Sequence, residues 1–183
     1  MARMPIPTDE DRVGRTIAST WRVEQILSRA GGFGVVYQGV HLRTGRPVAI
    51  KFLRHDIVGE DMRERFIREA QIIAKLDYPH IVQVLDVGDH DELGLYQVLE
   101  LLRGRTLTAR LEASPGERLS VPDCTRILVP VMEALAVTHR RAVVHRDVKP
   151  GNIFLHRDDD GQEIPKVLDF GIAKSLTTPK ALG

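Results

Sequence analysis

The sequence predicts an α+β fold in which a strand-rich segment with one helix precedes a mainly helical segment. Short apolar runs joined by tight polar turns indicate strands through most of the first 100 residues. Apolar residues recur at helical spacing between Asp61 and Leu76. Beyond Gly104 the pattern becomes helical, which places a boundary near residues 102–105. A chain of 183 residues can form one domain or two small units.

The first segment, residues 15–102, is expected to contain five strands and one helix. Residues 1–14 carry two prolines and an acidic run but no period that could bury a face, so we expect a flexible tail there. The tight connections between the strands indicate an antiparallel sheet. The strands are expected at residues 21–27, 35–37, 48–53, 81–87 and 93–101.

The second segment, residues 103–183, is expected to contain helices at 107–113 and 122–140. Nine of the 11 residues from Ile127 to Val137 are apolar, and a helix without a polar face belongs inside a protein. Pro130 interrupts this run, and an interior proline costs about 3 kcal/mol. The helix therefore either kinks at Pro130 or begins near it.

Composition excludes several classes of protein. The chain has 26 Lys and Arg against 25 Asp and Glu, which is unlike a nucleic-acid-binding arm or an acidic disordered tail. The single cysteine, Cys124, cannot form an internal disulfide or a cysteine-based zinc site. No apolar run approaches the roughly 20 residues of a membrane span, and the N-terminus lacks a secretory pattern. A cytoplasmic protein that binds no nucleic acid and spans no membrane is expected.

The most specific stretch is His145–Asn152. A carboxylate at Asp147 can accept a proton from a hydroxyl, and an ammonium at Lys149 can neutralise a phosphoryl group. The amide oxygen of Asn152 is a hard ligand suited to magnesium. The alternative is a charged surface turn in which Asp147 caps a helix. A chance match at five specified positions is rarer than about 1 in 1,000, so we favour the functional interpretation.

These eight residues resemble the catalytic loop of the protein kinases, and the resemblance extends over roughly residues 21–174. Asp169-Phe170-Gly171, 17 residues after Asn152, is similar to the family's second metal-binding motif. The resemblance implies a kinase fold with a five-stranded antiparallel N-lobe carrying one helix, and an incomplete, mainly helical C-lobe. It also implies that ATP and Mg²⁺ bind, with Asn152 and Asp169 as metal ligands.

Two charged residues of the first segment match further parts of the family pattern. Val48-Ala49-Ile50-Lys51 resembles the strand whose lysine binds the α and β phosphates, and Glu69 resembles its ion-pair partner. The alternatives are an ordinary strand lysine and a helix-surface acid. Glu69 lies near the apolar stripe of its helix, where an unpaired charge is unfavourable, so a cationic partner is expected.

The glycine-rich stretch matches the family pattern imperfectly. When the pattern is aligned on Gly34 and Val36, Gly31 and Gly32 fall within it, but Arg29 occupies the position of the first glycine. Phosphate-binding loops need glycine because backbone N–H groups must approach the phosphates closely. Arg29 is expected either to stiffen this loop or to make it cover the nucleotide less well, unless an insertion near Ser28 shifts the register.

The resemblance also assigns the adenine site. Residues 97–102 are similar to the hinge segment, in which backbone groups of Glu100 and Leu102 bond the adenine edge. Side chains of Val36, Ala49 and Leu155 would enclose the ring in a mostly apolar pocket. The alternative for residues 97–102 is an ordinary buried strand.

Taken together, the resemblance implies a transferase of the bacterial serine/threonine kinase type, which moves the γ-phosphoryl group of ATP to Ser or Thr hydroxyls of a protein substrate. The chain stops soon after the second metal-binding motif, so the alternative is an ATP-binding, pseudokinase-like regulatory module. Because later helices are absent from the chain, the outer face of the run Ile127–Val137 is expected to be exposed. Such a face favours a protein partner or self-association.

Overall fold

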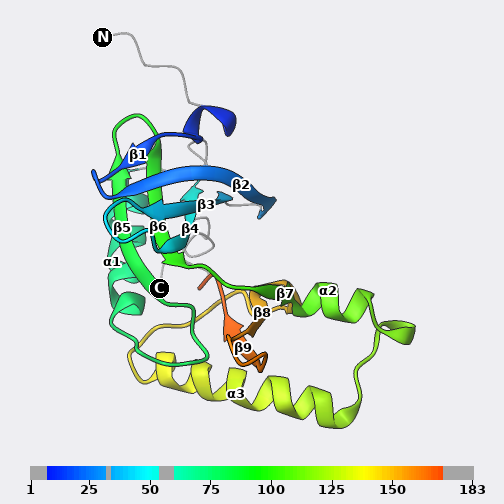
Figure 1. Cartoon of the computed structure of the whole chain (residues 1–183). Coiled ribbons are helices and arrows are strands. Elements are labelled where there is room, and N and C mark those ends of the chain that lie inside the picture. The colour runs from blue at the N-terminus through cyan, green and yellow to red at the C-terminus, as the bar shows by residue number, and fades with distance from the viewer. Residues whose placement is uncertain (1–7, 32–33, 54–59, 171–183) are drawn as a thin grey trace. The chain divides into compact units, whose positions relative to one another are not determined.

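The chain forms two compact units in this computed structural model, which describes residues 8–31, 34–53 and 60–170 (Figure 1). The first unit comprises Met1–Ala74 and Val84–Leu101, and the second comprises Lys75–Gln83 and Leu102–Gly183. The division at Leu102 lies close to the expected boundary, but residues 75–83, which were expected in the first segment, belong to the second unit.

Long-range backbone pairing explains why residues 75–83 belong to the second unit. Ile81 forms a parallel bridge with Val167. Val82 donates its N–H to the Val167 carbonyl at 3.0 Å, and Val167 donates to the His80 carbonyl at 2.8 Å. Ile81 was expected to begin a strand of the first segment, but that strand begins at Val84 instead.

The first unit is built on one antiparallel sheet with the strand order β1-β2-β3-β4-β6-β5 (Figure 1). It contains the five expected strands and a further two-residue strand, β1. The core consists of apolar side chains at alternate strand positions, among them Tyr37, Ile50 and Val98, none of which is exposed. The strands are β1 (Thr16–Ile17), β2 (Trp21–Gly31), β3 (Gly34–His41), β4 (Pro47–Leu53), β5 (Val84–His90) and β6 (Gly94–Glu100).

Strand β2 is longer than expected and irregular. It has 11 residues and pairs with the 8 residues of β3, with register shifts at three places. Each shift is a β-bulge, in which the longer strand inserts one residue and bends. The last bulge lies between Ser28 and Gly31, at the end of the strand that precedes the glycine-rich stretch.

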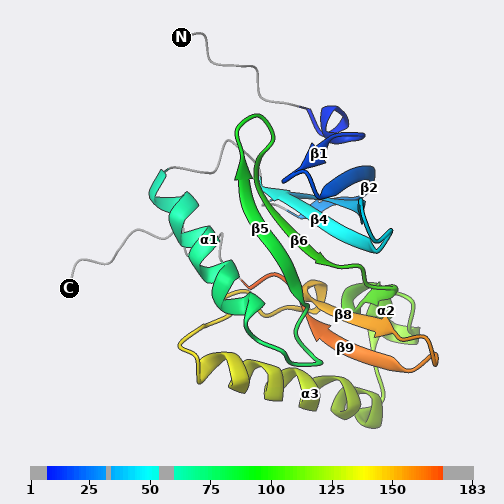
Figure 2. The ribbon, with the colours of Figure 1, turned by 60° about the vertical axis from the view of Figure 1, so that its left-hand side comes forward.

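Helix α1 (Glu60–Ala74) lies beside β5 (Figure 2). Phe66, Ala70 and Ile73 are buried at helical spacing, which confirms the single apolar stripe expected for this helix. Burial of each large apolar side chain contributes about 1.5–3 kcal/mol.

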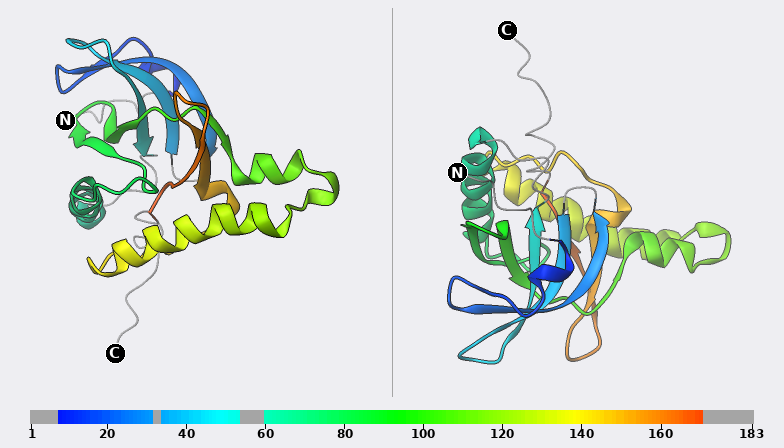
Figure 3. Two further views of the ribbon diagram at one scale, coloured as in Figure 1. Left: turned by 60° about the horizontal axis from the view of Figure 1, so that its bottom comes forward. Right: turned by 90° about the horizontal axis from the view of Figure 1, so that it is seen from above.

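Residues 8–14 differ from the flexible tail that was expected for residues 1–14; residues 1–7 lie outside the described part. A 3-10 turn, η1 (Glu10–Arg12), lies over the strands (Figure 3, right). Arg12 is only 4% exposed, and Gly14 donates its N–H to the Val23 carbonyl at 2.9 Å. The anchor is a buried guanidinium rather than an apolar stripe, so hydrophobic periodicity could not indicate it.

The second unit combines a three-stranded antiparallel sheet with two helices. The sheet has the order β7-β8-β9. Thr106 and Ser120 cap the two helices, each accepting a hydrogen bond from the backbone N–H three residues later at 3.2 Å. The elements are β7 (Gly104–Thr106), α2 (Leu107–Glu112), η3 (Pro115–Glu117), α3 (Val121–His139), η4 (Pro150–Asn152), β8 (Ile153–Arg157) and β9 (Glu163–Val167).

Helix α3 runs through Pro130 as one element (Figure 3, left). Of the two expected outcomes, a start near Pro130 is therefore wrong. The ring removes the N–H that would bond the Arg126 carbonyl, and Arg126 is exposed, so water can take that bond. One stripe of α3 is buried, through Ile127, Val131, Ala134 and Thr138.

The opposite side of α3 is exposed, as expected. Leu128, Val129 and Met132 are 42%, 40% and 58% exposed, so an apolar surface follows the helix. Among the helices that the structure describes, none combines the length and the apolar character needed to cross a bilayer.

Candidate active site

The loop after α3 brings Asp147, Lys149 and Asn152 together. The Lys149 Nζ lies 2.9 Å from the Asp147 Oδ2. The Asn152 Nδ2 donates to the Asp147 carbonyl at 2.8 Å and to its Oδ2 at 3.1 Å. These contacts fix the Asp147 carboxylate between a cation and an amide. That this loop acts in catalysis, and is not simply a charged surface turn, stays a prediction.

His145, which the sequence analysis left without a role, organises this loop. It is 2% exposed. Its Nε2 lies 2.7 Å from the Leu168 carbonyl, and its Nδ1 accepts the Asp147 N–H at 3.2 Å. Neutral imidazole with the proton on Nε2 satisfies both bonds. The ring also packs against Phe170 at 4.8 Å between centroids. The sequence feature that could have indicated this role of His145 is its position, two residues before Asp147.

The environment of His145 favours its neutral form. Burial lowers the pKa of His145 below its ordinary value, although the Leu168 carbonyl and the carboxylates of Asp169 and Asp147 act in the opposite direction. In the unfolded chain the pKa of this group lies near its ordinary value of 6.5. Between the lower folded value and 6.5, the unfolded chain binds a proton that the folded chain does not, so acidification destabilises the fold.

We therefore expect the free energy of unfolding to fall as the pH is lowered through this window, and to fall less in His145→Gln. Glutamine keeps one donor and one acceptor but does not titrate. Urea unfolding at several pH values between 7.5 and 5, in EDTA, measures the difference, because the two chains differ only at residue 145. Identical pH dependence in the two proteins would contradict the role of His145.

Asn152 and Asp169 are brought close by the backbone. Leu168, the residue before Asp169, donates its N–H to the Asn152 carbonyl at 2.8 Å. Asp169 has φ +43°, a left-handed conformation that is uncommon for a non-glycine residue and often marks a functional site. Asn152 is 8% exposed, and both of its side-chain hydrogen bonds described above use the nitrogen.

This donor set fits magnesium. Mg²⁺ takes oxygen ligands and is commonly held by one or two carboxylates together with substrate phosphates and water. Within the described residues, no cluster of three or more His, Cys, Asp or Glu side chains could form an all-protein metal cage. The amide oxygen of Asn152 and the carboxylate of Asp169 are oxygen ligands of the kind that magnesium takes.

In the first unit, Lys51 lies on β4 between two pairing strands. It is half-buried and faces Val36 on β3 and Gln97 on β6 in register. Ala49, two residues earlier on the same strand, faces Leu99. Glu69 is half-buried on α1, between the buried residues Phe66 and Ala70. The pairing of Lys51 with Glu69 stays a prediction.

The glycine-rich stretch connects β2 to β3. Gly31 pairs with Gly34, and Gly32 lies outside the described residues. A Cβ at Gly34 would lie 2.3 Å from the Phe52 carbonyl oxygen, so glycine is required there by the close approach of β4. Between Ser28 and Gly31 the β2 strand contains one residue more than the opposite strand. Arg29 lies within this bulge, and its place at the family's first glycine position stays a prediction.

The predicted adenine contacts are distributed over both units. Glu100 ends β6, Leu102 begins the longer part of the second unit, and Leu155 is a buried residue of β8. Val36 is half-buried and Ala49 is buried on adjacent strands. Their common contact with a nucleotide stays a prediction.

Comparison with known proteins agrees with this geometry. The protein kinase domain family matches residues 23–182. The chain is 36% identical over 172 residues to the serine/threonine-protein kinase pkn3 of Myxococcus xanthus, covering 93% of this chain and 31% of that protein. It is 37% identical over 170 residues to the serine/threonine-protein kinase PknA of Mycobacterium tuberculosis, covering 90% of this chain and 38% of that protein.

Solved structures give the same result. The crystal structure of the Mycobacterium tuberculosis PknI kinase domain matches with a TM-score of 0.76 and 31% identity, covering 87% of this chain and 62% of that chain. This chain thus spans about a third of the two curated relatives and less than two thirds of the PknI chain. The matching fold, the catalytic-loop geometry and the family match show that the chain belongs to the protein kinase family.

Proposed function

We propose that the protein is a serine/threonine protein kinase that transfers the γ-phosphoryl group of ATP to a Ser or Thr hydroxyl of a protein substrate. The observation that carries the proposal is the convergence of Lys149 and Asn152 on the Asp147 carboxylate, within 3.1 Å. The curated relatives named above, both serine/threonine kinases, support the choice of acceptor.

In this proposal Asp147 accepts the proton of the substrate hydroxyl. The hydroxyl oxygen forms a bond to the γ-phosphorus, and the bond from the γ-phosphorus to the leaving ADP breaks. Lys149 neutralises charge that develops on the transferred group. Lys51, held by Glu69, binds the α and β phosphates. When bound, magnesium offsets the charge of the phosphates, and Asn152 and Asp169 are the residues that would hold it.

The nucleotide contacts complete the assignment. We assign the phosphate cover to Gly31, Gly32 and Gly34. The hinge contacts fall to backbone groups of Glu100 and Leu102, and the apolar contacts with adenine to Val36, Ala49 and Leu155. A cytoplasmic location, where ATP is available, is part of the proposal.

Label transfer tests this function. The full chain is incubated with Mg²⁺ and ATP labelled at either the γ or the α position, together with a generic protein substrate. Transfer of γ but not α label, recovered as phosphoserine or phosphothreonine, is the expected result. Binding of MgATP without transfer would instead support the regulatory module expected as the alternative. Absence of both would contradict the proposal.

We further propose that the exposed apolar face of α3, formed by Leu128, Val129 and Met132, contacts another protein surface. Apolar surface of this kind on adjacent helical turns favours association. Met132→Lys is expected to reduce any concentration-dependent increase in mass measured by light scattering. A wild-type chain that stays monomeric and binds no protein substrate through this face would contradict the proposal.

A further inference from the structure

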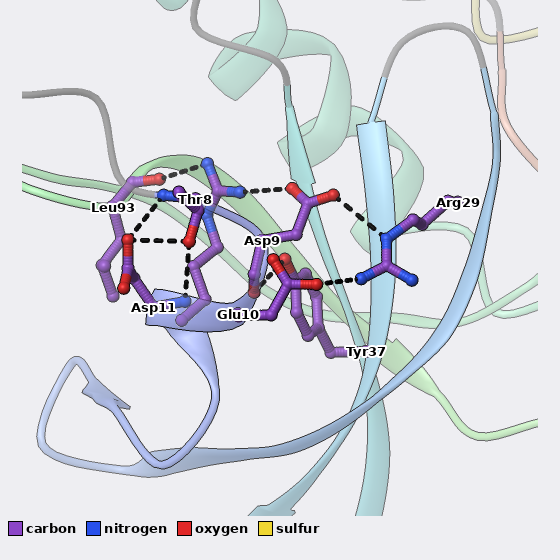
Figure 4. A network of polar contacts seen from close by, with 8 residues as sticks. Thr8, Asp9, Glu10, Asp11, Arg29, Tyr37 and Leu93 are labelled. Atoms are coloured by element: carbon purple, nitrogen blue, oxygen red, sulfur yellow. Dashed lines mark hydrogen bonds and ion pairs between the residues drawn. The ribbon is translucent and has the colours of Figure 1, made fainter.

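A short segment ahead of the sheet, Thr8–Arg12, is held by its own hydrogen bonds (Figure 4). The Thr8 N–H and hydroxyl both donate to the Asp11 Oδ2 at 2.8 Å, and the Asp11 N–H donates back to the Thr8 Oγ1 at 3.3 Å. These reciprocal bonds resemble those of a capping box, and they tie Thr8, just ahead of η1, to Asp11 within it.

Arg12 anchors the segment to the sheet. Its guanidinium is buried and lies 5.1 Å from the centroid of the Phe52 ring. It donates to the Leu93 carbonyl at 3.4 Å and to the Asp9 Oδ1 at 3.1 Å. A cation over an aromatic face, with a carboxylate beside it, is a favourable arrangement for a buried guanidinium. One oxygen of Asp9 is thereby fixed in place.

Tyr37 provides a second anchor at the same residue. Its side chain comes from β3 and is fully buried, and its hydroxyl donates to the Asp9 carbonyl at 3.0 Å. Both the backbone and the carboxylate of Asp9 are therefore held before any further partner binds. A partner of this carboxylate loses less conformational entropy than a partner of a mobile one.

Arg29 is that partner. Its Nε lies 3.4 Å from the Asp9 Oδ2, and a terminal nitrogen pairs with the Glu10 carboxylate (Figure 4). Arg29 belongs to the bulge between Ser28 and Gly31, where β2 inserts one residue. A bulge interrupts the ladder, so this end of β2 has fewer backbone bonds to hold it. The side-chain contacts of Arg29 supply a restraint at that point.

We propose that Arg29 is a positioning residue that, through Asp9 and Glu10, fixes the end of β2 and thereby strengthens the binding of ATP phosphates. The inference rests on the proposed function, since it concerns the strand that leads to the proposed phosphate cover. The residue that departs from the glycine pattern thus has a task of its own: it ties the bulged strand to the segment ahead of the sheet.

The test compares three variants of the full chain by calorimetry with MgATP and, separately, with adenosine, which has no phosphates. Arg29→Met removes the cation, and Asp9→Asn with Glu10→Gln removes the two anions while keeping their shape. Arg22→Met is the control, because Arg22 lies on the same strand and pairs with Glu24 at a similar exposure. Arg29→Met and the double variant are expected to weaken MgATP binding by up to about five-fold, the upper end of the effect of exposed ion pairs. Adenosine binding, and both affinities of Arg22→Met, should be unchanged.

Combining the variants separates positioning from direct attraction. The triple variant combines Arg29→Met with Asp9→Asn and Glu10→Gln. If Arg29 acts through the two acids, this variant binds MgATP no more weakly than Arg29→Met alone. If Arg29 attracts phosphate directly, removing the acids leaves MgATP binding unchanged or strengthens it, and the inference is overturned. Arg29→Lys keeps the charge but not the planar fork, so an intermediate affinity is expected.

Hydrogen exchange at residues 28–31 gives a readout that needs no nucleotide. Exchange in this segment should be faster in Arg29→Met and in the double variant than in the wild type, and unchanged in Arg22→Met. Unchanged exchange, or equal losses of ATP and adenosine affinity, would overturn the inference. If the wild-type chain binds neither MgATP nor adenosine, both the proposed function and this role of Arg29 are overturned. If the wild-type chain binds MgATP and the variants bind it with the same affinity, only this inference is overturned.

Discussion

Asp147→Asn is expected to reduce phosphoryl transfer by about 10²- to 10⁴-fold, the range associated with loss of a general base. Asparagine has nearly the shape of aspartate and can still accept one hydrogen bond from Lys149 or Asn152, so the loop should keep its conformation. The loss should therefore appear in the chemical step, and the affinity for MgATP should change little. Single-turnover transfer from γ-labelled ATP, with calorimetry on the same preparations, measures both quantities.

Asp123→Asn is a matched control for this experiment. Asp123 lies in the same unit and accepts a hydrogen bond from the Ser120 hydroxyl at 2.8 Å, far along the chain from the catalytic loop. Its transfer rate should equal that of the wild type. Equal rates in Asp147→Asn and the wild type would show that another group, or another protein, accounts for the activity.

Lys51→Met is expected to weaken MgATP binding about 10- to 100-fold. Hydrogen bonds to charged groups contribute about 1.5–3 kcal/mol, and methionine keeps the length of the side chain without its charge. The fold should survive, since Lys51 is only half-buried and its flanking core residues, Ile50 and Phe52, are untouched. Calorimetric titration with MgATP measures the affinity.

Lys75→Met, at an exposed position, is the control for a general loss of positive charge. It should bind MgATP as the wild type does, because a solvent-exposed lysine without a phosphate partner adds only weak, screened attraction. Equal affinity in Lys51→Met and the wild type would remove Lys51 from the nucleotide site and leave it as an ordinary strand lysine.

Local sequence was sufficient to predict much of the sheet, helix α1 and a loop at residues 145–152. Phe66, Ala70 and Ile73 repeat at helical spacing, and Asp147, Lys149 and Asn152 lie within six residues of one another. In these cases the periodicity or the spacing of the residues predicts their arrangement, because the side chains that lie together are close in the sequence.

The features that sequence reasoning missed depend on distant partners. Arg12 is buried, and its guanidinium donates a hydrogen bond to the carbonyl of Leu93, 81 residues further along the chain. A charged residue within a polar stretch of sequence does not indicate such burial. Residues 80–82 pair with Val167, which no local pattern indicates. The bulge at Ser28 arises from the register in which β2 pairs with β3, and hydrophobic periodicity does not indicate that register.

The metal site offers the most direct test of the central claim, which is that Asn152 and Asp169 hold the metal of a bound nucleotide. Asn152 is the only asparagine in the chain, so selective ¹⁵N labelling of asparagine gives one side-chain amide signal. Paramagnetic Mn²⁺ replaces Mg²⁺ in octahedral oxygen sites. Addition of MnATP, but not of MgATP at the same concentration, is predicted to broaden this signal beyond detection, and Asp169→Ala should abolish the effect. A sharp Asn152 signal at saturating MnATP would contradict the assignment.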